Sequence, residues 1–258
     1  MTPEKIVNLT LSPIFDRDFI NSCKMQLSRN GVLLIENFLS VDAVSNLQCE
    51  AKSLRQLAFF CRQHHNVYLL EHESSLSDKH IRNLQQVSDK GCVPHDQIPK
   101  GSPLRTLYEW HGFKAFLESI MELPIFPYAD TLSSININYY EKGQQLGWHF
   151  DNASFAITLM IQAPKEGGEF EYLEKVRNQE AGDEGYEYTE AIVKGHINPK
   201  KLKIVDGSLA FFMGRNSLHR VTPVVSDLSR ILVTLNFNTK PGIMLSEIAR
   251  MTFFGRKD

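Results

Sequence analysis

The stretch SSININYYEKGQQLGWHFDNASFAITLMIQ, residues 133 to 162, holds three runs of apolar, aromatic and β-branched residues, separated by short polar segments with glycine. Such runs are typical of strands, and Gly, Asn, Asp and Ser are typical of the turns between them. Side chains alternate between the two faces of a strand, so His149 and Asp151 are expected on one face and Trp148 and Phe150 on the other. The stretch therefore predicts strands that carry two ionisable groups on one face.

The same pattern extends over residues 124 to 242. Further strand-like runs in this region are GGEFEYLE, KLKIVDGSLAFFM, HRVTPVV and RILVTLNFN. Several short strands separated by turn residues favour a β-sandwich or jelly roll. Residues 174 to 203 are acidic and rich in glycine, and we expect a long excursion between strands there, with a lid over the site as an alternative.

The first 123 residues look different, because their apolar positions recur at helical spacing. We expect helices over residues 16–30, 40–61 and 104–123, with Asp16 and Ser40 as N-caps and Gly31 as the end of the first. A buried strand is expected over 32–39 and a short one over 67–70. We interpret His64, His65, His72 and His80 as solvated loop histidines, because their spacing fits no common metal site.

These patterns predict a mainly β protein with flanking helices (α+β). Its core is a double-stranded β-helix (jelly-roll, cupin-like), and the N-terminal helices pack outside. We expect one domain over 1–258, divided into a helical support region (1–123), the jelly-roll core (124–242) and a C-terminal tail (243–258).

Composition excludes several classes of protein. The chain has 258 residues, of which 42% are hydrophobic and 22% charged, with a formal net charge of −2. This balance argues against binding to nucleic acid by bulk charge, and no apolar run approaches the length of a membrane span. The four cysteines form no CxxC pair, so we expect them reduced in a cytoplasmic protein.

A metal site needs a third ligand beside His149 and Asp151. His219 lies on a separate predicted strand, 68 positions after Asp151, and completes a 2-His-1-carboxylate set, the arrangement of non-haem Fe(II) oxygenases. An HxD pair by itself is also compatible with hydrogen-bonded strand residues that bind no metal. Arg230 favours the metal-site interpretation, because an arginine in the apolar run RILVTLNF is costly unless an anion pairs with it. A buried salt bridge is the structural alternative.

With these residues the sequence resembles the Fe(II)/2-oxoglutarate-dependent oxygenases. The resemblance covers about residues 130–242 and includes YEKG at 140–143, HFD at 149–151 and GRNSLHRVTPV at 214–224. Within that superfamily it is similar to stand-alone amino-acid hydroxylases related to carrier-independent radical halogenases, and also to prolyl-hydroxylase-like domains.

The resemblance implies roles for individual residues. His149, Asp151 and His219 would bind Fe(II), and Arg230 would bind the far carboxylate of the cosubstrate 2-oxoglutarate. O2 would be consumed, with release of succinate and CO2. In the related halogenases a small residue stands at the position of Asp151 and leaves room for a halide, so Asp151 implies hydroxylation.

The resemblance leaves some positions open. Many members carry Ser or Thr two residues after the arginine, where this chain has Leu232, so another group must hold the cosubstrate. The candidates for that contact are Tyr139, Tyr140 and Thr158, although ordinary packing explains the tyrosines equally well. The candidates for substrate contacts are Asn136, Asn138, Thr234 and Asn236, for which cross-strand hydrogen bonding is the alternative.

The expected function is hydroxylation of an unactivated C–H bond of a small polar substrate, with a free amino acid or a derivative as the leading class. The first alternative is a peptidyl, prolyl-hydroxylase-like enzyme, and the second is a non-catalytic jelly-roll protein that binds a metal or a ligand. We expect no nucleic-acid or membrane partner. The sequence leaves the oligomeric state open, with a homodimer as one option.

Overall fold

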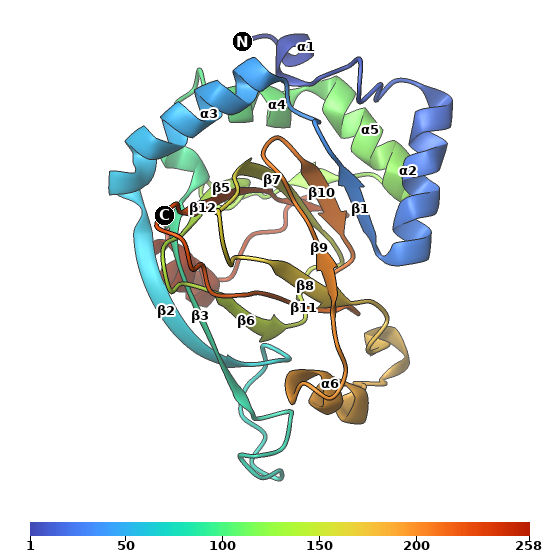
Figure 1. Cartoon of the computed structure of the whole chain (residues 1–258), viewed down its shortest axis with the longest axis vertical. Coiled ribbons are helices and arrows are strands. Elements are labelled where there is room, and N and C mark those ends of the chain that lie inside the picture. Colours follow the sequence, from blue (N-terminus) through green and yellow to red (C-terminus); the bar gives the residue numbers. More distant parts are fainter.

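Two antiparallel sheets face each other in the computed structural model, which describes all residues from 1 to 258 (Figure 1). The larger sheet has seven strands, in the spatial order β1 (Val32–Ile35), β10 (Leu209–Phe212), β7 (Ala156–Gln162), β12 (Arg230–Leu235), β5 (Ile135–Tyr140), β3 (Gln85–Val93) and β2 (Phe59–Asn66). The smaller sheet has four strands, in the order β6 (Leu146–His149), β11 (Leu218–Val221), β8 (Phe170–Leu173) and β9 (Lys200–Leu202). A separate pair consists of β4 (Phe126–Pro127) and β13 (Phe237–Asn238). This two-sheet arrangement confirms the predicted jelly-roll core.

Helices cover the outer face of the larger sheet (Figure 1). They are α1 (Pro3–Ile6), α2 (Arg17–Asn30), α3 (Val41–Leu54), α4 (Pro103–Glu109) and α5 (His111–Met121). Strand β5 illustrates that the two faces of the larger sheet have different surroundings. Ile135 and Ile137 belong to the hydrophobic core shared with these helices. Asn136 and Asn138 alternate with them and line a cavity on the opposite face. The alternation of the sequence ININ thus separates the helix-packed core from the space between the sheets.

The N-terminal region contributes more than helical support. Three strands of the larger sheet, β1, β2 and β3, come from the first 123 residues. β1 lies within the strand expected over 32–39, whereas β2 and β3 were not expected. Residues 67–70 were expected as a strand and instead follow β2 as a turn and a coil. The sequence did not indicate β2 and β3, because β2 leaves one face largely exposed and carries few apolar residues to mark its period.

The structure confirms the predicted helix caps, but the second and third helices differ in length from the prediction. The Asp16 side chain accepts a hydrogen bond from the Phe19 N–H, and Gly31 ends α2 in the left-handed conformation. The helix expected to reach residue 61 ends at Leu54, followed by a 3-10 turn over Arg55–Leu57. The helix expected over 104–123 is two helices, because Trp110 between α4 and α5 adopts an extended backbone.

The expected C-terminal tail contains helix α7 (Glu247–Phe254), which packs on β2 and β3. Its Phe253 and Phe254 line the cavity between the sheets, so this segment belongs to the site region. Residues 174–203 contain α6 (Tyr186–Val193) and the edge strand β9, and of this segment Leu202 of β9 lines the cavity. None of the helices has the length and hydrophobicity that a membrane-spanning segment requires.

Candidate metal centre

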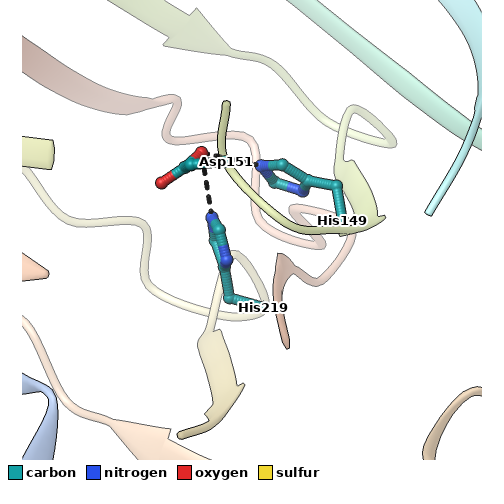
Figure 2. A group of neighbouring side chains, drawn as sticks. All are labelled: His149, Asp151 and His219. Atoms are coloured by element: carbon teal, nitrogen blue, oxygen red, sulfur yellow. Dashed lines mark ion pairs between the residues drawn. The ribbon is translucent and has the colours of Figure 1, made fainter. Parts of the chain in front are cut away.

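Antiparallel pairing of β6 with β11 places His149 directly opposite His219. Asp151 follows β6, and its backbone N–H donates to the carbonyl oxygen of Gly214 at 3.1 Å. Figure 2 shows that the three side chains converge: Asp151 Oδ1 lies 3.6 Å from His149 Nε2 and 3.5 Å from His219 Nε2. One potential ligand atom of each residue lies within 4.8 Å of the others, so the group has the geometry to hold one metal ion.

Hydrogen bonds to the backbone fix the orientation of both imidazoles. His149 Nδ1 lies 2.8 Å from the carbonyl oxygen of Gly147, and His219 Nδ1 lies 3.0 Å from that of Ser217. A carbonyl oxygen accepts only, so each Nδ1 carries the proton and donates. Nε2 of each ring therefore faces Asp151 and is the nitrogen available to a metal ion.

The protonation states of His149 and Asp151 also suit metal binding. Burial, together with the nearby His219, lowers the pKa of His149 to about 4, so its imidazole is neutral at pH 7. Burial by itself raises the pKa of Asp151, but the two imidazoles outweigh this and hold it well below its ordinary value. The site thus offers one carboxylate and the neutral imidazole of His149, with Nε2 of His219 beside them.

The carboxylate of Asp151 has unused bonding capacity. Its Oδ2 is buried and has no hydrogen-bond partner in the protein. A buried oxygen without a partner is costly unless a ligand satisfies it. Two imidazoles and a carboxylate are the donor set of non-haem Fe(II) sites, so these residues fit the metal that the resemblance implies.

A cavity of about 330 Å³ lies between the two sheets and contains the three ligands. Arg230 lines it and is 1% exposed, with its guanidinium 5.1 Å from the centre of the Tyr140 ring. Its Nε and Nη1 have no hydrogen-bond partner, and no carboxylate of the protein pairs with it. The alternative of a buried salt bridge does not hold, because Arg230 is a buried cation that lacks a counter-ion.

The residues expected near the cosubstrate divide between two faces of the larger sheet. Tyr140 and Thr158 line the cavity, as does Leu232. Tyr139 does not, because its side chain lies on the helix-packed face and its hydroxyl donates to the carbonyl oxygen of Ala51 at 2.7 Å. The expectation for Tyr139 is therefore corrected, since successive residues of a strand point to opposite faces.

The four expected substrate contacts, Asn136, Asn138, Thr234 and Asn236, all line the cavity. Asn136 Nδ2 donates to the carbonyl oxygens of Leu132 and Ile135, and Asn236 Nδ2 donates to Asn136 Oδ1 at 3.0 Å. The bond from Asn236 to Asn136 is the cross-strand contact considered as the alternative, and the other two are local to the segment of Asn136. They leave Asn136 and Asn236 little capacity for a ligand.

Two cavity residues, His65 on β2 and Lys90 on β3, escaped the sequence analysis. The His65 ring centre lies 6.1 Å from that of His149, and its Nε2 lies 2.6 Å from Ser88 Oγ. Ser88 Oγ in turn accepts a hydrogen bond from the N–H of Gly147, whose carbonyl orients His149. The interpretation of His65 as a solvated loop residue was therefore wrong. Cys61, Gln63 and His65 alternate along β2 and line the cavity, but the sequence of β2 is too polar to show this period.

Comparison with known proteins supports the fold and gives a family. The model of a protein family described as halogenase D matches residues 15–250. A search of curated proteins finds no match.

Several solved structures share the fold. An oxidoreductase of the 2OG-Fe(II) oxygenase family from Burkholderia pseudomallei superposes with a TM-score of 0.54 at 12% identity, covering 87% of this chain and 92% of that one. A prolyl hydroxylase from Trichoplax adhaerens, in complex with a hypoxia inducible factor peptide fragment, gives 0.54 at 16% identity over 89% and 92%. The α-ketoglutarate-dependent carbocyclase SnoK from nogalamycin biosynthesis gives 0.58 at 14% identity over 100% and 94%. At these identities the likeness establishes the fold.

Proposed function

The chain belongs to the halogenase D family and has the fold of the Fe(II)/2-oxoglutarate-dependent oxygenases, and from this premise we propose that it hydroxylates a small polar substrate. One observation carries the proposal. Two imidazoles and one carboxylate converge in a cavity that also holds Arg230, a buried cation without a counter-ion. A ferrous ion would bind the two imidazoles and the carboxylate, and a dicarboxylate cosubstrate would supply the counter-ion of Arg230.

In this proposal His149, Asp151 and His219 hold Fe(II) through their Nε2 and carboxylate atoms. Arg230 binds the far carboxylate of 2-oxoglutarate, with its unpaired Nε and Nη1 as donors. When bound, the iron and 2-oxoglutarate supply the oxidising chemistry, in which O2 is consumed and succinate and CO2 are released. The protein orients the reactants and keeps the site dry.

Tyr140 and Thr158 are the proposed additional cosubstrate contacts, in place of the Ser or Thr that this chain lacks at Leu232. Tyr140 stacks on the Arg230 guanidinium and thereby restricts where it points. Thr158 lines the same cavity.

Asp151 supports hydroxylation over halogenation. Its carboxylate stands where the related halogenases have a small residue, so it would take the coordination position that a halide needs. The absence of a side chain at Gly214 makes room for this carboxylate, because a Cβ there would overlap Asp151 Oδ2. The chain thus combines membership of a halogenase family with the ligand set of a hydroxylase.

A free amino acid or a close derivative is the proposed substrate class, since the cavity of about 330 Å³, lined in part by Leu245, Phe253 and Phe254 of the C-terminal segment, has the volume of a small-molecule site. A peptidyl substrate is the alternative, and it rests on the fold shared with prolyl hydroxylases. We propose a cytoplasmic location because all four cysteines are free.

The test is succinate formation from 2-oxoglutarate and Fe(II), screened separately against pooled free amino acids and pooled peptides. We expect the amino-acid pool to stimulate turnover and one of its members to gain the mass of one oxygen. Stimulation by peptides alone would favour the alternative substrate class. If no pool stimulates turnover, and Asp151→Ala leaves metal and ligand affinity unchanged, the chain is a binding protein and the proposal is wrong.

A further inference from the structure

Lys90 is a second cation in the cavity, and no part of the proposed iron and cosubstrate chemistry uses it. Its Nζ donates to Asn138 Oδ1 at 2.7 Å and lies 5.4 Å from the centre of the Phe253 ring. An ammonium group has three N–H donors, and the other two find no acceptor in the protein. Lys90 forms no ion pair with any carboxylate of the chain. The ammonium group therefore retains hydrogen-bonding capacity and charge for a ligand.

The surroundings of Lys90 hold it in place. Asn138 Nδ2 donates to the carbonyl oxygens of Asn136 and Leu232, so the carboxamide is fixed with its oxygen toward Lys90. Phe253, from helix α7, covers another side of the ammonium group. Asn138 is thus a positioning residue for Lys90. The Lys90 ammonium group keeps two N–H donors free for a ligand.

Lys90 also stays charged. Burial lowers its pKa, but the neighbouring Tyr140, Cys92 and Cys61 outweigh that effect and raise it above its ordinary value.

The charges of the cavity do not balance without an additional anion. Lys90 and Arg230 are its two permanent cations, and Asp151 is the one carboxylate among its lining residues. A ferrous ion and the dianion of 2-oxoglutarate cancel each other, and Asp151 offsets one of the two cations. One positive charge remains in the cavity, where an anionic ligand would offset it. No carboxylate remains to pair with an ammonium group on a substrate side chain.

We propose that the substrate is a small carboxylate with a net negative charge, of the size of an acidic amino acid, and that Lys90 binds its carboxylate. This inference rests on the proposed function, because it assigns the substrate class of the same site. Lys90 lies on β3 and Arg230 on β12, with Tyr140 of β5 stacked on Arg230, so substrate and cosubstrate carboxylates have separate anchors. The assignment excludes amino acids with cationic side chains.

The first experiment compares isosteric pairs that differ in charge. L-aspartate is compared with L-asparagine and L-glutamate with L-glutamine, and L-lysine serves as the cationic probe. Binding is measured as the rise in Tm of the Mn(II)- and 2-oxoglutarate-loaded protein, which involves no turnover. Turnover is measured as succinate formation and as the gain of one oxygen with Fe(II). We expect an acid to exceed its amide by about tenfold in kcat/KM, as a charge-assisted hydrogen bond provides.

Variants of Lys90 then test the anchor itself. Lys90→Gln should reduce the preference for acid over amide to about one, and Lys90→Arg should restore part of it. The KM for 2-oxoglutarate should change little in either variant. The matched control is Lys114→Gln, which removes a lysine with a similar contact, 5.5 Å from the Phe126 ring, outside the cavity. This control should leave the preference unchanged.

The outcomes separate the inference from the function on which it rests. A wild-type preference for L-lysine or for the amides would overturn the charge assignment, while succinate formation would still support the oxygenase. An increase in the KM for 2-oxoglutarate in Lys90→Gln, without loss of the acid preference, would overturn the role of Lys90. If the wild-type protein neither binds 2-oxoglutarate nor forms succinate, both proposals are wrong.

Discussion

The carboxylate of Asp151 lies against the backbone of Gly214, and a side chain at position 214 would occupy the same space as Asp151 Oδ2. The same two residues are joined by a hydrogen bond from the N–H of Asp151 to the carbonyl oxygen of Gly214 at 3.1 Å. The loop before β11 therefore fixes the carboxylate that follows β6. Because a metal ligand must be held within a fraction of an ångström, a side chain at position 214 should lower the metal affinity of the site.

Gly214→Ala should weaken Fe(II) binding by about 10- to 100-fold, the range typical of changes next to metal ligands, because its Cβ displaces the Asp151 carboxylate. Calorimetric titration with Mn(II) measures the effect. Gly101→Ala is the control, since a Cβ at Gly101 meets nothing within 4 Å. Equal affinities in the two variants would show that Gly214 does not position Asp151.

Asp151→Gly should abolish hydroxylation and lower metal affinity, because it removes the anionic ligand and leaves the two imidazoles. The vacated position should then accept a halide, so the products are analysed for chlorine isotope patterns in the presence of chloride. Asp151→Asn serves as the comparison, because it removes the charge while keeping the volume. Retention of wild-type hydroxylation by Asp151→Gly would contradict the ligand role of Asp151.

Arg230→Met should have opposite effects on stability and on cosubstrate binding. Without 2-oxoglutarate it should raise the free energy of unfolding by about 1–4 kcal/mol, because it replaces a buried, unpaired charge with an apolar side chain. It should also weaken 2-oxoglutarate binding by about 2–5 kcal/mol. Urea denaturation and titration of 2-oxoglutarate measure the two quantities.

Arg220→Met provides the contrast for Arg230→Met. Arg220 Nη2 lies 2.7 Å from Oε2 of Glu171, which is 5% exposed, so its loss leaves a buried carboxylate without its strongest partner. This variant should lower the free energy of unfolding. If both arginine variants destabilise the protein equally, Arg230 is not an unpaired charge, and the prediction is wrong.

Ser88→Ala should affect the metal site through the backbone. Ser88 Oγ links His65 Nε2 to the N–H of Gly147, whose carbonyl oxygen orients His149. Its removal leaves partly buried polar groups without a partner, at a cost of about 1 kcal/mol of stability, and should weaken metal binding. Ser53→Ala removes an exposed side-chain hydrogen bond and is the control. Thermal unfolding without metal measures the general loss of stability. Mn(II) titration measures the change in metal affinity at the site.

Much of the fold followed from local patterns. The alternating runs of residues 133–162 and 230–238 predicted β5, β7 and β12, because their two faces pack against different surroundings. Strands β2 and β3 did not follow, because polar side chains on both faces conceal the period, and Trp110 interrupts the third predicted helix without a Gly or Pro at that position. His65 and Lys90 were missed because they lie on β2 and β3.

The sequence by itself determined the chemistry that is available: the spacing of His149 and Asp151, the distant His219, and an arginine within an apolar run. The tertiary structure decided which groups share the cavity and which are already occupied. It turned Tyr139 toward the helices, used the amides of Asn136 and Asn236 in cross-strand hydrogen bonds, and brought Lys90 into the cavity with free donors. The physical reason is that a residue's type fixes what bonds it can form, whereas the pairing of strands distant in the chain fixes which partners it meets.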